Sequence, residues 1–219
     1  MAFNFKMTGI KVPSHLDSRD STAVLGDSVS FQGKVIKAEA ALRGFHFQYD
    51  KGDQNFGKEA VGISSHKLDG KKVRYKVNAH FCDLDNTSSF HGSVGVLVLA
   101  DVSQVVNDAT PIAFKSTRIN FDASPKSSRI LPGSVHFARP VKWAQAMLKG
   151  FLMEYVNTDQ DFFLQRVGVS KVTVEDDVVN FETYFQLEDV MVARGENPAK
   201  SDKQIRGSID VVVLAALQK

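Results

Sequence analysis

Acidic and amide side chains recur in this chain at fixed spacing. Asp53–Asn55 reads Asp-Gln-Asn, and Asp159–Asp161 reads Asp-Gln-Asp. Clustered side-chain oxygens of this kind can hold calcium or the hydroxyl groups of a sugar, although Asp and Asn also end turns, which is the favoured interpretation. Asp83 and Asp189 form a second recurring pair at the ends of two predicted strands, where a turn residue is again the alternative. The five acidic residues Asp53, Asp83, Asp159, Asp161 and Asp189 are candidates for a non-catalytic ligand site.

Residues suited to catalysis do not recur in the same way. None of the six histidines has a histidine at the matching position of the other repeat. The chain also lacks a nucleophile elbow of the Gly-x-Ser-x-Gly type, a phosphate-binding glycine loop and the His/Cys spacing of a zinc site. The sequence therefore predicts a protein that is not an enzyme, with no catalytic residue, no metal and no cofactor.

The chain is built on an internal repeat. Residues 28–83 and 134–189 align without a gap at an offset of 106, with 18 identical positions out of 56. The repeat includes Leu42–Phe45 and Leu148–Phe151, which read Leu-Arg-Gly-Phe and Leu-Lys-Gly-Phe. An ungapped match of this extent predicts two copies of one domain, each near 100 residues and within the usual domain range.

Hydrophobic patterning predicts strands throughout each copy. Residues 4–12 alternate apolar and polar positions, Pro13–Asp27 is typical of a loop, and Val29–Val35 is the next predicted strand. The alanine-rich stretches before Gly44 and Gly150 have helical propensity, but the alternation around each glycine favours a long strand with a bulge. The apolar closing strands are predicted to be central in their sheets.

These elements indicate an all-β fold of two tandem antiparallel β-sandwich domains with about six strands each. The predicted boundaries are 1–106 for the first copy and 107–219 for the second. The closing strands lie 115 residues apart, so the second copy carries an insert of nine residues (115 − 106), placed near 194–204.

Composition limits the partners and the compartment. The net charge of +2 is too small to indicate a nucleic-acid partner, and the single cysteine excludes an internal disulfide. The longest apolar run, Val211–Leu217, is far shorter than the roughly 20 residues that span a bilayer. With no signal peptide at the N-terminus, we expect a cytoplasmic protein, or one released by lysis or built into a particle, with no membrane partner.

Four segments of the second copy resemble H-type lectins, the family of snail agglutinins and of the C-terminal domain of slime-mould discoidins. Val135–Pro140 is similar to the family's opening strand and Arg166-Val167 to its second element. Phe181–Asp189 resembles the aromatic strand and Ile209–Ala215 the closing strand. The resemblance covers most of the second copy and, more weakly, the first.

The resemblance implies a six-stranded antiparallel sandwich that forms trimers or hexamers and binds sugar at subunit edges without catalysis. Arg166 would match the sugar-contacting arginine, and the region from Tyr184 to Gln186 would match the family's Trp-containing edge. The first copy has Ala60 at the position of Arg166. The predicted ligand-binding residues are Arg166, Gln186, Asp189, Asp159, Asp161, Asp53 and Asp83.

Two functions therefore follow from the sequence. One is lectin-like carbohydrate recognition by a tandem β-sandwich that forms a homo-oligomer, either a trimer or a ring, with a glycan as its ligand. The other is a structural subunit of a phage or phage-like contractile injection particle, where particle proteins are the partners. A structural subunit would order the insert near 194–204 against a neighbour, whereas a lectin would leave it mobile or use it to frame the ligand.

Overall fold

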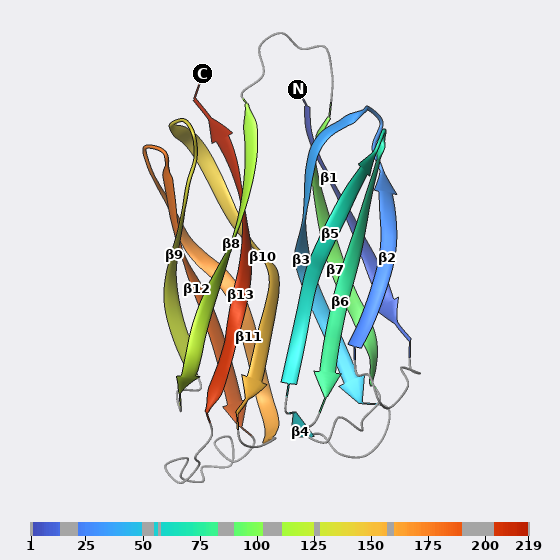
Figure 1. Ribbon diagram of the computed structural model, residues 1–219, viewed down its shortest axis with the longest axis vertical. Helices are drawn as coiled ribbons and strands as arrows, with labels where there is room; N and C mark the ends of the chain where they lie inside the picture. Colours follow the sequence, from blue (N-terminus) through green and yellow to red (C-terminus); the bar gives the residue numbers. More distant parts are fainter. Residues whose placement is uncertain are drawn as a thin grey trace.

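The structure is a computed structural model that describes residues 2–13, 22–49, 55–56, 58–82, 90–102, 111–124, 128–156, 160–189 and 204–218. Within these ranges all regular elements are β-strands and no helix occurs (Figure 1). The strands are β1 (Ala2–Val12), β2 (Thr22–Ser30), β3 (Val35–Tyr49), β4 (Asn55–Phe56), β5 (Lys58–Asp69), β6 (Lys72–Cys82), β7 (Phe90–Val102), β8 (Ile112–Ser124), β9 (Ser128–His136), β10 (Val141–Tyr155), β11 (Gln160–Glu175), β12 (Val178–Asp189) and β13 (Ile205–Leu217). The predicted all-β fold is confirmed.

The strands form three antiparallel sheets with a sandwich-like arrangement. Their orders are β1-β7-β3, β2-β6-β5-β10-β13-β8 and β4-β11-β12-β9. The six-stranded sheet joins the two halves of the chain, because β5 of the first half pairs with β10 of the second. The closing strands β7 and β13 each lie between two neighbours, which confirms their predicted central position.

Backbone contacts recur between the halves at the sequence offset of 106. The amide of Phe31 donates to the carbonyl of Lys71 at 2.8 Å, and the amide of Phe137 donates to the carbonyl of Asp177 at 2.8 Å. The strand orders of the halves also correspond, β1-β7-β3 with β8-β13-β10 and β2-β6-β5 with β9-β12-β11. The duplication and the boundary at residue 106 stay predictions, since one sheet runs continuously across that boundary.

The two alanine-rich stretches are extended, as the alternation around their glycines predicted. They lie in β3 and β10, and the register of each strand shifts just before its glycine, between Leu42 and Gly44 and between Leu148 and Gly150. The burial of apolar side chains on the pleated strands thus overrides the local helical propensity.

The predicted strand at Val29–Val35 is wrong. The chain leaves β2 after Ser30 and enters β3 only at Val35. Phe31 and Val35 are both buried, and their amides donate to backbone carbonyls of the β5–β6 hairpin. The predicted loop at Pro13–Asp27 is also too long, because β2 begins at Thr22. The insert near 194–204 lies almost wholly outside the described residues.

Apolar side chains of the central strands form the core. The inward-facing residues of β7 and β13 have no exposed surface; they are Val94, Val96, Val98, Ala100, Ile209, Val211, Val213 and Ala215. Their β-branched side chains suit a strand that is covered by a facing sheet. The described part of the chain contains no helix with the length and hydropathy needed to cross a membrane.

Contacts between the halves join residues that are 106 positions apart. The amide of Gln165 donates a hydrogen bond to the carboxyl group of Glu59, and the rings of Phe45 and Phe151 lie 5.0 Å apart. These contacts, and a sheet in which β2-β6-β5 of one half joins β10-β13-β8 of the other, have the pattern that an approximate two-fold axis between the halves produces. We call the paired segments of β5 and β10 the junction, and the facing edges of β3 and β11 the rear seam.

Candidate functional site

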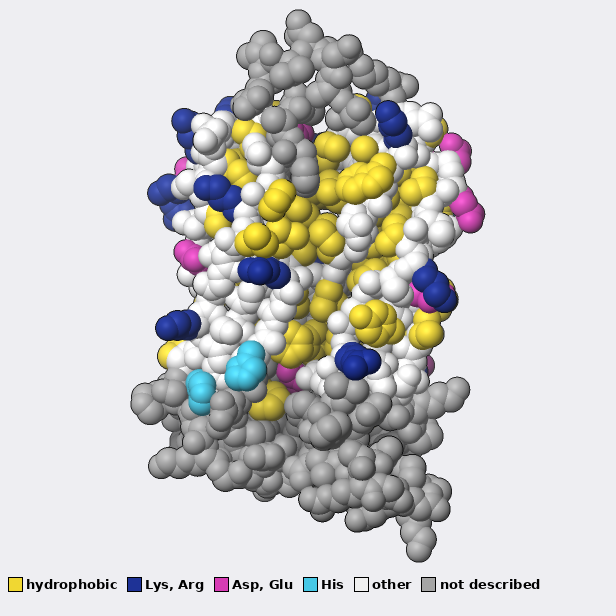
Figure 2. Space-filling view, turned by 180° about the vertical axis from the view of Figure 1, so that it is seen from behind, with side chains coloured by type: hydrophobic (Ala, Val, Ile, Leu, Met, Phe, Trp, Pro, Cys, Tyr) yellow, Lys and Arg dark blue, Asp and Glu magenta, His cyan; other side chains and the backbone are white. Residues whose placement is uncertain are grey.

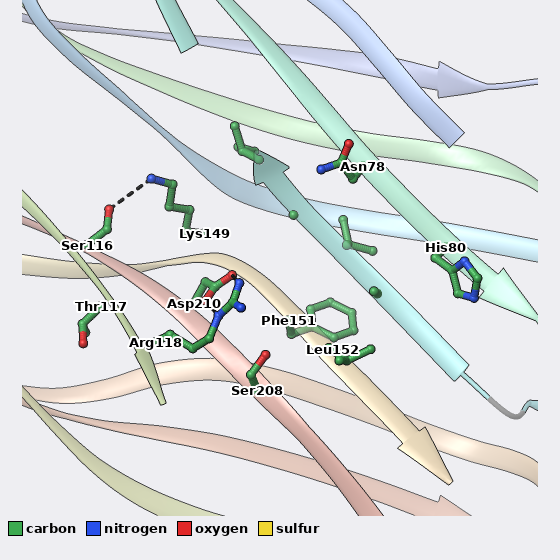
Figure 3. Close-up of a pocket in the computed structure, with 14 residues that line it drawn as sticks. Asn78, His80, Ser116, Thr117, Arg118, Lys149, Phe151, Leu152, Ser208 and Asp210 are labelled. Atoms are coloured by element: carbon green, nitrogen blue, oxygen red, sulfur yellow. Dashed lines mark hydrogen bonds and ion pairs between the residues drawn. The ribbon is translucent and has the colours of Figure 1, made fainter. Parts of the chain in front are cut away.

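A groove with a volume of about 630 Å³ crosses the outer face of the six-stranded sheet at the junction. Five neighbouring strands line it, in the order β6-β5-β10-β13-β8. Its side chains come from both halves, so the groove exists only because β5 pairs with β10. In Figure 3, Arg118, Asp210 and Ser208 lie toward one side, Asn78 and His80 toward the other, and Phe151 and Leu152 lie between them.

Arg118 and Asp210 form a bidentate ion pair in the groove. They face each other on β8 and β13, and the Arg118 Nε and Nη2 atoms donate to the two carboxylate oxygens of Asp210 at 2.6 and 2.8 Å. These hydrogen bonds raise the pKa of Arg118 above its ordinary value. The bidentate contact fixes both groups in one plane, while the guanidinium keeps further donors and the carboxylate further lone pairs for a ligand.

Lys149 supplies a second fixed donor. Its Nζ atom lies 3.1 Å from a carboxylate oxygen of Glu39 and 3.1 Å from the Ser116 Oγ atom. Only about a fifth of each side chain in the Lys149–Glu39 pair is exposed, 20% and 17%. The ion pair with Glu39 therefore fixes the position of the Lys149 Nζ atom, which donates to Ser116.

The middle of the groove is apolar and lies where the backbones of the two halves come closest. Leu152 is directly opposite Ala60, and Gly150 is directly opposite Gly62. A Cβ atom added at Gly150 would lie 2.8 Å from the Cα atom of Gly62. Small residues here let β5 and β10 pair closely, and the partly exposed Leu152 side chain gives the groove an apolar centre between polar walls.

Glu59 lies at the junction, directly before Ala60 of the groove lining. It is 1% exposed, and desolvation raises its pKa to about 8, while the hydrogen bond from Gln165 opposes the shift. Glu59 is therefore protonated at neutral pH, which removes the cost of burying a charge between the halves.

The structure brings two of the predicted ligand residues together. Arg166 of β11 and Gln186 of β12 are direct cross-strand partners; Arg166 is exposed and Gln186 is partly exposed. Asp189 lies opposite Phe162 at the end of β12, and the backbone of Asp161 pairs with Asn55 of β4. The remaining three candidates, Asp53, Asp83 and Asp159, lie outside the described residues, and these seven positions stay predictions.

Sequence reasoning missed the groove residues because they come from five strands spread over both halves. Two of them carried a local signal. Asp210 is a charged residue inside the apolar run of β13, and Lys149 belongs to the recurring Leu-Lys-Gly-Phe segment, where the first copy keeps a cation, Arg43. Neither signal could indicate that Arg118 lies opposite Asp210, since that depends on the register of β8.

Among the described residues, no three His, Cys, Asp or Glu side chains are arranged to hold a metal ion. Comparisons of the chain with models of known protein families, with curated proteins and with solved structures find no match. The geometry of the groove and the pattern of the sequence therefore carry the functional proposal.

Proposed function

We propose that this protein is a non-catalytic binding protein whose groove at the junction recognises a carbohydrate, the class of ligand that its resemblance to H-type lectins implies. The single observation that carries the proposal is the bidentate Arg118–Asp210 pair beside the apolar centre of the groove. Sugars present hydroxyl groups that both donate and accept, together with apolar C–H faces. A planar pair with spare donors and acceptors next to Leu152 matches both features.

Hydroxyl and amide groups of the lining extend this match. Ser208 and Thr117 lie beside the pair, and Asn78 faces them across the junction (Figure 3). These side chains are neutral, and most lie on strands held by neighbours on both sides. A site built on paired strands changes little on binding and loses little conformational entropy, which favours recognition of a weakly bound ligand such as a sugar.

A glycan array probed with the labelled protein tests the proposal. We expect one class of sugar to bind, and we expect Arg118→Ala to weaken that binding about tenfold or more, because the remaining Asp210 carboxylate loses its partner. Arg74→Ala is the matched control: Arg74 forms a 2.9 Å surface ion pair with Asp69 away from the groove. Arg118→Lys should also weaken sugar binding, since the lysine ammonium group cannot form the planar bidentate contact with Asp210.

The same array distinguishes the groove from the position that the lectin resemblance implies. Loss of sugar binding in Arg166→Ala, with Arg118→Ala unaffected, would place the ligand at β11 and β12 and contradict the groove. An array with no signal for the unmodified protein would contradict carbohydrate binding altogether.

A role as a structural subunit of a phage or phage-like particle is the second proposal, and it is supported by exposed apolar side chains. Phe5 and Met7 lie on one face of β1 and are 60% and 56% exposed, and Trp143 of β10 is 51% exposed. Large apolar side chains that neighbour one another on a strand face are typical of subunit contacts. In this proposal the partners are further copies of the chain and other particle proteins.

A further inference from the structure

Under the approximate two-fold axis, the pairing of β5 with β10 predicts a matching pairing of β11 with β3. Of these two, the described structure contains only the first, although a two-residue pairing of β4 with β11 also joins the halves. On one side β5 pairs with β10 from Lys58–Gly62 to Gly150–Glu154. The matching strands on the other side are β11 and β3. In the described residues β3 is the edge of its sheet, and β11 is flanked by β12 and, at Gln160 and Asp161 alone, by β4.

Glycines at matching positions have different surroundings at the junction and at the rear seam. Gly150 is buried and lies against Gly62. Its counterpart Gly44 is exposed, and a Cβ atom added there would meet no described atom within 4 Å. Gly168, the counterpart of Gly62, is covered by the ring and hydroxyl group of Tyr184 from its own half. The edge of β3 at Gly44 is therefore open.

The residues opposite one another explain why the rear seam does not close. At the junction the pair is Leu152 with Ala60, and at the rear seam the matching positions are His46 and Arg166. Both side chains are exposed, and Arg43 is exposed one residue before Gly44. Bulky and cationic side chains resist the close pairing that a leucine and an alanine permit.

The rear seam is apolar between these cations. Phe45 of β3 and Val167 and Val169 of β11 pack on the core but stay partly exposed. Figure 2 shows hydrophobic side chains gathered along the middle of this face, with Lys and Arg side chains on both flanks. No described residue forms an ion pair with Arg43 or Arg166. An open strand edge, an apolar floor and two arginines that form no ion pair within the described part of the chain are thus found together.

We propose that the rear seam binds an extended acidic peptide segment of a partner protein, which adds a strand to the open edge of β3. Backbone hydrogen bonds from that edge would hold the segment, as in other cases of strand addition. Alternate side chains of the segment would contact the apolar floor, and its carboxylates would pair with Arg43 and Arg166. The site lies apart from the groove at the junction, so it goes beyond the proposed sugar site and does not depend on it.

Binding of a labelled peptide of about ten residues with alternating Glu and Val tests this inference. We expect fluorescence anisotropy to show saturable binding of this peptide to the full chain and little binding of a Lys-Val peptide. The double variant Arg43→Glu/Arg166→Glu should bind the Glu-Val peptide about tenfold more weakly and should bind the Lys-Val peptide more tightly than the unmodified chain does. Arg74→Glu/Lys76→Glu, on the outer face of β6, makes the same change in charge elsewhere and should leave binding unchanged.

Hydrogen exchange separates strand addition from simple attraction between charges. Bound peptide should slow amide exchange within residues 41–46 and leave residues 72–78 unchanged. Equal binding by the Arg43→Glu/Arg166→Glu variant, or no protection of residues 41–46, overturns the proposal. Protection of residues 41–46 without peptide, together with a solution mass above one chain, also overturns it, because a second copy of the chain would then be the occupant.

Discussion

The buried carboxyl group of Glu59, which lies between the two halves, makes the free energy of unfolding depend on pH. Its pKa is about 8 in the folded protein and returns to the ordinary value of 4.5 when the chain unfolds. Between these values the folded state binds more protons than the unfolded state, so the free energy of unfolding falls as pH rises. Below pH 4.5 and above pH 8 this group adds no further pH dependence.

Replacing Glu59 tests that behaviour. We expect the free energy of unfolding, measured with urea between pH 5 and 8, to fall by up to about 1.4 kcal/mol per pH unit through this group. Glu59→Gln should remove that part of the slope, because glutamine keeps an amide partner for Gln165 and does not titrate. Glu175→Gln, at an exposed position of β11, is the control. A slope that persists in Glu59→Gln would show that another group is responsible.

At the scale of the element, the bulges in β3 and β10 have different roles although their sequences match. The Leu42/Gly44 shift lies on an open edge, whereas the Leu148/Gly150 shift brings β10 against β5. A glycine at a bulge therefore allows a strand pairing between the halves in the second half of the chain and leaves a strand edge open in the first.

The two glycines form a matched pair for measurement. Gly150→Ala places a Cβ atom 2.8 Å from the Gly62 Cα atom and the Val61 carbonyl oxygen, so β5 and β10 must separate. We expect a loss of about 1–3 kcal/mol in the free energy of unfolding from overpacking. Gly44→Ala meets no described atom within 4 Å and should change it by less than about 0.5 kcal/mol. Equal losses would contradict the difference between the junction and the rear seam.

At the scale of the whole molecule, the halves pack as a dimer would, through an approximate two-fold axis and one continuous sheet. This arrangement uses the β5 and β10 edges and leaves apolar side chains of β1 and β10 on the surface. Exposed strand edges and apolar faces are the surfaces through which sheet proteins associate. The proposed homo-oligomer therefore has surfaces available outside the junction.

Light scattering across a range of concentrations tests the assembly. If Phe5 and Met7 form a subunit contact, the unmodified chain should have the mass of three or more copies, and Phe5→Ser/Met7→Ser should lower that mass. Val24→Ser alters a side chain of β2 that is equally exposed, at 60%, and should have no effect. A single-chain mass at every concentration would contradict both the lectin-like oligomer and the particle subunit.

The sequence alone determined the fold class and much of the strand pattern. Alternation and β-branched closing strands predict antiparallel sheets with β7 and β13 at their centres, because a strand with one buried face must place apolar residues at every second position. The glycine bulges were predictable as well, since the alternation breaks at Gly44 and Gly150. The strand at Val29–Val35 was predicted wrongly, because two buried side chains can flank a turn as readily as they can share a strand.

Only the tertiary structure decided where the two halves meet. Ala60 and Arg166 are at matching positions, and the residues around them in the sequence are similar. The neighbouring sequence therefore does not indicate that β5 pairs with β10 at Ala60 while Arg166 lies at an open edge. The meeting of Arg118 with Asp210 and of Glu59 with Gln165 depends on strand register and on packing between halves. Contacts between residues far apart in the chain are set by the global arrangement of the sheets, which short-range patterns do not encode.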